Sequence, residues 1–133
     1  MSATRKAVHF GDFMEDVYGF AQAVQSGDTI YVAGQTAFAA DGTIGGGADM
    51  AGQMRAAYVN VARVLEQFGA TMRDVVDETL FAVDGLTAGM VAKDVRREFY
   101  GDDFAVASTL CEVRALGTPE LLIEIKCIAR IDP

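Results

Sequence analysis

The sequence contains few of the residues that build metal sites and disulfides. Its 133 residues include one His, two Cys, two Pro and no Trp. Cys111 and Cys127 have no CxxC spacing, and two thiols of this kind are typical of reduced core residues rather than a disulfide. No group of residues has the spacing of metal ligands. The sequence therefore gives no indication of a metal site.

A basic cluster and a long apolar run are also missing. Nineteen acidic against eleven basic residues give a net charge of −8. A chain with this balance and no Lys/Arg cluster repels nucleic acid. No stretch reaches the roughly 18–20 apolar residues of a membrane span, and no apolar run follows the positive charges in residues 1–10. We expect a soluble cytoplasmic protein with neither nucleic-acid nor membrane partners.

The length and composition indicate one globular domain over residues 1–133. Hydrophobic residues make up 51% of the chain, which is the profile of a folded protein. Periodicity and turn signals predict a hairpin over 20–38 that turns at 26–28, a helix over 49–69, a strand over 78–84, a second helix capped at Thr87, and strands over 107–113 and 121–129. This order predicts an α+β fold in which both helices cover one face of a single sheet.

Apolar positions define the buried sides of the two predicted helices. The first helix has Asp49 at its N-cap and Gly69 at its end. The second helix is expected to bury Met90, Val91, Val95 and Phe99.

Two features that resemble functional motifs have simpler interpretations. Glycines 45–47 lack the Lys-Ser/Thr of a phosphate-binding loop and the spacing of a dinucleotide fingerprint, so we interpret residues 40–49 as a flexible loop. His9, the single histidine, falls in a predicted N-terminal strand or tail, where a surface or packing role is expected.

Alternation of side chains assigns the faces of the last two strands. Positions 107, 109, 111 and 113 are small and mainly apolar, so we expect them to pack against the helices, with 108, 110, 112 and 114 on the other face. In the final strand the apolar set is Leu121, Ile123, Ile125 and Cys127, which leaves Leu122, Glu124, Lys126 and Ile128 on the opposite face. An uncovered face that contains Leu and Ile predicts self-association.

Glu124 is the candidate catalytic residue. Its apolar neighbours in the strand would raise the pKa of a partly buried carboxyl, which suits a general acid or base. The alternative is a rim carboxylate paired with Lys126, because structural ion pairs also perturb pKa values.

The order and spacing of these segments resemble the Rid family, the reactive intermediate deaminases also called YjgF or L-PSP endoribonuclease proteins. The similarity covers roughly residues 20–130 and includes AQAVQSGDTIYVAGQ, VVDETLFAVD and STLCEV…LLIEIKCIA. It implies a chorismate-mutase-like α+β domain that forms a homotrimer around a central barrel. It further implies small-molecule ligand clefts between subunits, and hydrolysis of imines and enamines such as 2-aminoacrylate without a cofactor or metal.

Carried over residue by residue, the resemblance gives a mixed site. The family's first-strand aromatic, usually Tyr, falls on Phe20, its small polar residue on Ala33, and its closing-strand carboxylate on Glu124. A backbone carbonyl near Cys111 is expected to assist. The family's substrate-gripping arginine falls on Ser108, so this chain lacks it.

Another cation must replace the missing arginine if the substrate has a carboxylate. Arg114 would lie roughly 20 Å from Ser108 along the same strand, whereas Lys126 is about 7 Å from Glu124 on the same face. Lys126 is therefore the candidate to bind the substrate carboxylate in place of the missing arginine.

Three functions follow from these residues. The first is hydrolysis or deamination of an imine, an enamine or a related reactive metabolite other than 2-aminoacrylate, at Glu124. The second is non-catalytic binding of a small metabolite by a trimer. The third is a ribonuclease or translation-inhibitor role, which the acidic charge and the lack of a His pair disfavour.

Overall fold

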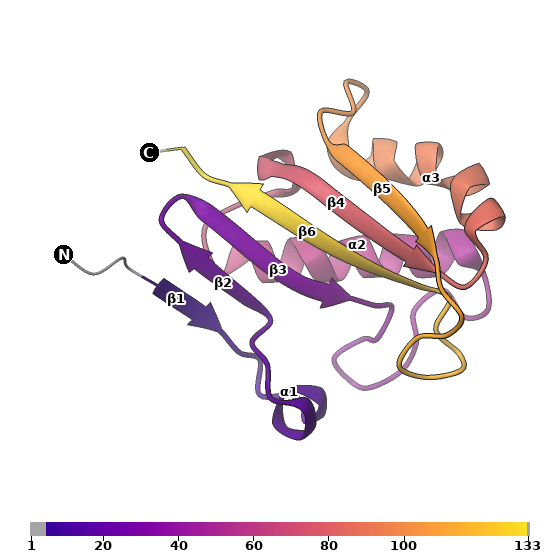
Figure 1. Ribbon diagram of the computed structural model, residues 1–133, viewed down its shortest axis with the longest axis horizontal. Coiled ribbons are helices and arrows are strands. Elements are labelled where there is room, and N and C mark those ends of the chain that lie inside the picture. Colours follow the sequence, from indigo (N-terminus) through magenta and orange to yellow (C-terminus); the bar gives the residue numbers. More distant parts are fainter. Residues whose placement is uncertain (1–4, 133) are drawn as a thin grey trace.

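Six strands form one mixed sheet in the order β1-β2-β3-β6-β4-β5 (Figure 1). The computed structural model describes residues 5–132. The strands are β1 (Arg5–Val8), β2 (Ala23–Ser26), β3 (Thr29–Gln35), β4 (Val75–Ala82), β5 (Ala107–Glu112) and β6 (Ile123–Arg130). Neighbouring strands are antiparallel except β4 and β5, which are parallel and joined through a helix. The hairpin predicted at 26–28 is confirmed as the turn between β2 and β3.

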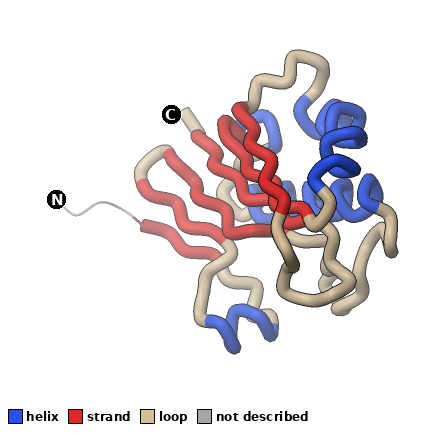
Figure 2. Tube along the Cα trace, turned by 45° about the vertical axis from the view of Figure 1, so that its right-hand side comes forward, coloured by secondary structure: helices blue, strands red, loops and turns tan. Residues whose placement is uncertain are grey.

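Two long helices, α2 (Met50–Glu66) and α3 (Gly85–Tyr100), cover the same side of the sheet (Figure 2). Asp49 caps α2 as predicted, because its side chain accepts a hydrogen bond from the backbone of Gly52 at 2.9 Å. The helix buries its predicted apolar face against the sheet, with Met54, Tyr58 and Val61 fully buried. The α+β prediction, with one mixed sheet and both long helices on one face, is confirmed.

The start of α3 differs from the prediction. Asp84, not Thr87, is the N-cap, and Thr87 lies in the first turn with its backbone N–H and its hydroxyl both donating to Asp84. Met90 was expected in the core but is 77% exposed. The helix buries alanines at 88 and 92 because small side chains let it pack close to the sheet.

The faces predicted for β5 are reversed. Ser108 and Glu112 lie on the helix side, where Glu112 Oε1 accepts a hydrogen bond from Gly85 N–H at the start of α3. Cys111 lies beside Phe81 of β4 and faces the uncovered side. The prediction was wrong because β5 is an edge strand beside a buried polar group, so polar rather than small apolar residues are needed under the helix.

A short helix, α1 (Phe13–Tyr18), was not predicted. Asp12 caps its first turn by accepting from Glu15 N–H at 2.9 Å. Gly19 ends it in the left-handed region, with φ of 73°, which glycine adopts without strain. Its segment lies below the ends of β1 and β2 in Figure 1.

The uncovered face of β6 matches the prediction. Ile123, Ile125 and Cys127 are fully buried on the helix side, whereas Glu124 and Lys126 face away from the helices. Both cysteines are free thiols, as expected. None of the helices described between residues 5 and 132 is long and apolar enough to cross a membrane.

Candidate functional site

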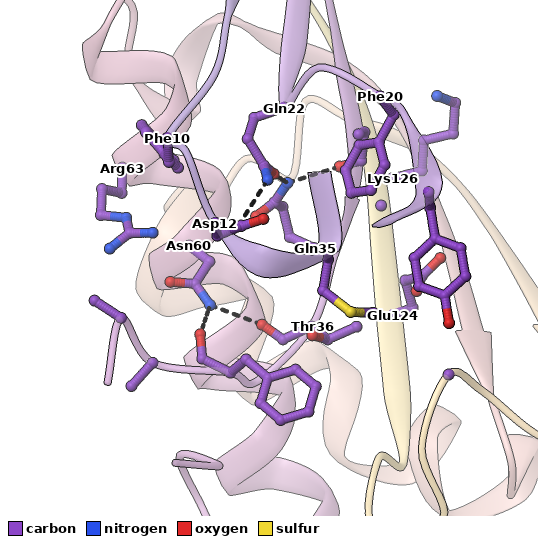
Figure 3. Close-up of a pocket in the computed structure, with 18 of the residues that line it drawn as sticks. Phe10, Asp12, Phe20, Gln22, Gln35, Thr36, Asn60, Arg63, Glu124 and Lys126 are labelled. Carbon is purple, nitrogen blue, oxygen red and sulfur yellow. Dashed lines mark hydrogen bonds between the residues drawn. The ribbon is translucent and has the colours of Figure 1, made fainter. Parts of the chain in front are cut away.

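A cavity of about 860 Å³ opens at the ends of β3 and β6, beside α1 and α2 (Figure 3). Four of the predicted site residues line it: Phe20, Ala33, Glu124 and Lys126. Residues of α1 also line it, notably Met14 and Tyr18, which the sequence analysis did not include. The fold therefore brings the closing strand, the first hairpin and an unpredicted helix to one site.

Glu124 presents an unpaired carboxylate to this cavity. It lies on β6 opposite Phe81 of β4 and is partly buried. No hydrogen bond or ion pair joins its carboxylate to another of the residues 5–132. Burial raises the pKa of Glu124, and the positive charge of Lys126 opposes the shift only in part. The close Lys126 pair considered from the sequence is therefore absent, and a carboxyl with a raised pKa suits proton transfer.

Gly34 on β3 makes room for the Glu124 side chain. A Cβ at this position would lie 2.7 Å from Cδ and 2.9 Å from Cγ of Glu124, closer than carbon atoms pack. The carboxylate must move if residue 34 has a side chain.

Replacing Gly34 by Ala should lower the rate of any reaction that uses the Glu124 carboxylate, without a large loss of stability. The backbone at Gly34 is not in the left-handed region, so alanine fits the strand and only the Glu124 carboxylate is displaced. We expect kcat/KM to fall about tenfold or more, since a shift of about 1 Å in a reacting group costs up to roughly 100-fold. Gly117→Ala is the control, because Gly117 lines the same cavity and a Cβ there meets nothing. Equal activity in the two variants would contradict the placement of Glu124.

A buried polar network supports the cavity next to α1. Gln22 Nε2 donates to Glu15 Oε2 at 2.8 Å, and Gln35 Nε2 donates to Gln22 Oε1 at 2.9 Å. Burial alone would raise the pKa of Glu15, but hydrogen bonds from Phe10 N–H, from Gln22 and from Gly11 N–H together lower it. These bonds join the end of β3 to α1 and so hold the cavity wall in place.

Ser108 and Cys111 do not line the cavity of the same chain. Ser108 lies under the helices, where its Oγ donates to Glu78 Oε2 at 2.6 Å and accepts from Arg96 Nη2 at 2.7 Å. Cys111 faces the open side of the sheet on the edge strand. Within one chain Ser108 thus lies on the opposite face of the sheet from Glu124 and Lys126, whereas Cys111 lies on their face, separated from Glu124 by Phe81 of β4.

Glu78 is the centre of a buried cluster that the sequence analysis did not identify. Its Oε1 accepts hydrogen bonds from Tyr58 Oη at 2.6 Å and Tyr100 Oη at 2.8 Å. Its Oε2 accepts from Arg96 Nε at 2.8 Å as well as from Ser108. Burial, followed by the charge of Glu78, raises the pKa of Tyr58 well above its ordinary value. The cation bonded to Ser108 is therefore Arg96 of α3.

Comparisons with known proteins agree on one family over nearly the whole chain. A family model described as endoribonuclease L-PSP matches residues 13–131. Rv2704 of Mycobacterium tuberculosis, a member of the YjgF/YER057c/UK114 family, is 32% identical with a TM-score of 0.83, covering 96% of this chain and all of that one. YyfB of Yersinia pestis, from the Rid protein family, is 30% identical with a TM-score of 0.69 and covers 96% and 98%. An uncharacterised protein of Streptomyces coelicolor is 26% identical, over 91% of this chain and 88% of its own length.

Proposed function

Because this chain belongs to the endoribonuclease L-PSP family, which includes the YjgF and Rid proteins, we propose that it hydrolyses a small imine or enamine in the cavity around Glu124. The observation that supports this most is the carboxylate of Glu124, which lines the cavity without a hydrogen-bonding partner among the described residues. A carboxyl that is free to exchange protons with a ligand can act as the general acid and base in hydrolysis of a C=N bond.

The proposed reaction adds water to the carbon of the C=N bond. The substrate is the protonated imine: as the water oxygen bonds to its carbon, Glu124 takes a proton from the water and the C=N π electrons move to the nitrogen, which becomes a neutral amine. The carboxyl of Glu124 then gives this proton to the amine nitrogen. As the C–N bond breaks, the hydroxyl proton passes to Glu124 and the carbonyl forms, and the released ammonia takes up that proton and leaves as ammonium. A raised pKa brings the acid and base forms of Glu124 closer in population near neutral pH, which suits both steps. Phe20 and Ala33 would contact the apolar part of the substrate.

Ammonia release from imines tests this proposal. The imines are generated in the assay by an amino-acid oxidase, and ammonia is measured with and without the protein. We expect acceleration over the spontaneous rate that depends on Glu124. If ammonia release is unchanged for every imine tested, the catalytic proposal is wrong.

The uncovered sheet face supports a second part of the proposal, a homotrimer. This face exposes Tyr31 by 47%, on β3 opposite Ile128 of β6. We expect sedimentation equilibrium to give about three times the 14.2-kDa chain mass. A monomer mass at micromolar concentration would contradict the assembly. In a trimer Cys111 would be available to the cavity of a neighbouring subunit, whereas Ser108 is held by Glu78 and Arg96.

Lys126 is proposed to bind a carboxylate next to the reacting carbon. Its side chain lines the cavity and forms no ion pair within residues 5–132. Lys126→Met should lower kcat/KM about tenfold for imines of amino acids, since a charge-assisted contact is lost. Imines of simple amines, which have no carboxylate, serve as the control substrates and should be affected little. Equal losses on both classes would exclude the contact.

Non-catalytic binding of a metabolite is the second candidate function. Phe20 and Ala33 lack the hydroxyl groups of the corresponding family positions, and Ser108 lies outside the cavity. Saturable binding by calorimetry without turnover would favour this function. A ribonuclease role is disfavoured by the net charge of −8.

A further inference from the structure

The cavity is larger than the proposed reaction requires. An imine of six heavy atoms fills about 180 Å³, if each atom takes roughly the 30 Å³ that a water molecule occupies in the liquid. The cavity holds about 860 Å³. Figure 3 shows Glu124 and Lys126 at one side of it and Arg63 with Phe10 at the other. A ligand that reacts at Glu124 therefore has room to extend toward α2.

The α2 side of the cavity presents a cation without a counter-charge. Asn60 and Arg63 lie on one face of α2, Gln67 follows as the C-cap of the helix, and all three line the cavity. The guanidinium of Arg63 lies 4.7 Å from the centre of the Phe10 ring. None of the ion pairs found within residues 5–132 includes Arg63. An unpaired cation at a cavity wall is notable in a protein with a net charge of −8.

The surroundings of Arg63 are held in place by hydrogen bonds. Asn60 Nδ2 donates to Thr36 O at 2.8 Å and to Phe38 O at 2.7 Å, which fixes the segment after β3 against α2. Phe10, the platform for Arg63, donates its backbone N–H to Glu15 Oε2 at 2.9 Å. A positioned guanidinium loses less conformational entropy on binding than a free one.

Negative charge between the two sides restricts where an anion can bind. Asp12 lines the cavity, and both of its carboxylate oxygens already accept hydrogen bonds, from Glu15 N–H and Gln22 Nε2. The buried carboxylate of Glu15 adds to the negative potential. An anionic group of a ligand is therefore repelled from the middle of the cavity and attracted at Arg63.

We infer that the cavity binds an elongated ligand with a remote oxyanion, a carboxylate or a phosphate, held by Arg63. This inference rests on the proposed function only for the orientation of the ligand, which places the reacting carbon at Glu124. The substrate class is then an imine or enamine whose far end is negatively charged. The planar guanidinium suits such a group because it donates two parallel hydrogen bonds to two oxygens.

Calorimetric binding of 2-oxo acids, the products of the proposed reaction when the substrate is the imine of an amino acid, tests the inference. The probes are 2-oxo dicarboxylates of four to seven carbons and 2-oxo monocarboxylates of equal length; a phosphonate-ended analogue separates the two oxyanions. At the best chain length we expect the natural protein to bind the dicarboxylate with a Kd about tenfold to a hundredfold lower than that of the monocarboxylate of equal length. Arg63→Met should remove this preference, and Arg63→Lys should retain part of it. Arg55→Met is the matched control, because Arg55 lies on the same helix and is paired with Glu98 at the surface.

The outcomes separate this inference from the proposed function. Because binding needs no turnover, a preference that depends on Arg63 supports the remote anion site even if no imine is hydrolysed. A preference that survives Arg63→Met, no preference at any length, or no binding of any probe overturns the inference. Turnover that depends on Glu124 but not on Arg63 would leave hydrolysis standing and reject only the anion site.

Discussion

Replacement of Glu78 by Ala is expected to cost about 3–5 kcal/mol of the free energy of unfolding, the range measured when one partner of a buried ion pair is removed. Glu78 is fully buried and its partner Arg96 is only 21% exposed. The variant leaves the guanidinium without a counter-charge and the hydroxyls of Tyr58 and Tyr100 without an acceptor. Domains of this size have roughly 5–15 kcal/mol of stability, so the loss is a large share of the total.

An exposed ion pair in the same protein provides the control. Arg55 and Glu98 form two hydrogen bonds, Nε to Oε1 and Nη2 to Oε2, both at 2.8 Å, which is the Nε–carboxylate distance of the Arg96–Glu78 pair. Their side chains are 46% and 44% exposed, so water competes for both charges. Glu98→Ala should cost less than about 1 kcal/mol. Urea unfolding at one protein concentration compares the two variants, and equal losses would show that burial does not set the strength of the Glu78 cluster.

A second comparison separates charge from shape at Glu78. Glu78→Gln keeps the volume and still accepts from the two tyrosines, but it removes the negative charge facing Arg96. We expect a loss between those of the Ala variant and the surface control. A loss as large as that of Glu78→Ala would mean that the ion pair, rather than the tyrosine contacts, dominates the cluster.

The elements that could be predicted from the sequence are those with strong local signals. Asp49 and the apolar stripe of α2 predicted that helix, and alternation in the final strand predicted which side chains of β6 are buried. The short helix α1 has six residues, too few for a periodic pattern, and its N-cap Asp12 alone did not reveal it. Local patterns therefore predict long elements and miss the short one that lines the cavity.

The sequence predicted the site only in part. Alternation of side chains assigned the faces of β6 correctly, whereas the faces of β5 depend on contacts with residues distant in the sequence. Glu124 follows from the regular pattern of β6, and Phe20 and Ala33 follow from the family resemblance. Ser108 was placed on the wrong face because nothing local in β5 shows that a carboxylate thirty residues earlier, Glu78, is buried beside it. Long-range polar contacts of this kind depend on the packing of α3, which sequence spacing does not specify.

Glu124→Gln should lower the rate of imine hydrolysis by about 10²- to 10⁴-fold, the contribution typical of a positioned acid or base. Glutamine fits the space beside Gly34, but its amide cannot act as an acid or a base near neutral pH. In the natural protein the acid limb of the rate profile should lie above pH 4.5, the ordinary pKa of a glutamate, because burial raises the pKa of Glu124. Glu66→Gln, at an exposed carboxylate on α2, is the control and should retain full activity.

The same substitution should stabilise the fold at neutral pH. A raised pKa in the folded state means that the charged form of Glu124 is less favourable there than in the unfolded chain. This penalty is absent below about pH 4, where both states are protonated, and is fully present above the folded-state pKa. Glu124→Gln removes it, so we expect a higher Tm than the natural protein at pH 7–8 and equal Tm values near pH 3.5. A higher Tm together with lost turnover is the pattern of a residue kept for chemistry at the expense of stability. A lower Tm at pH 7–8 would instead show that the Glu124 carboxylate stabilises the fold.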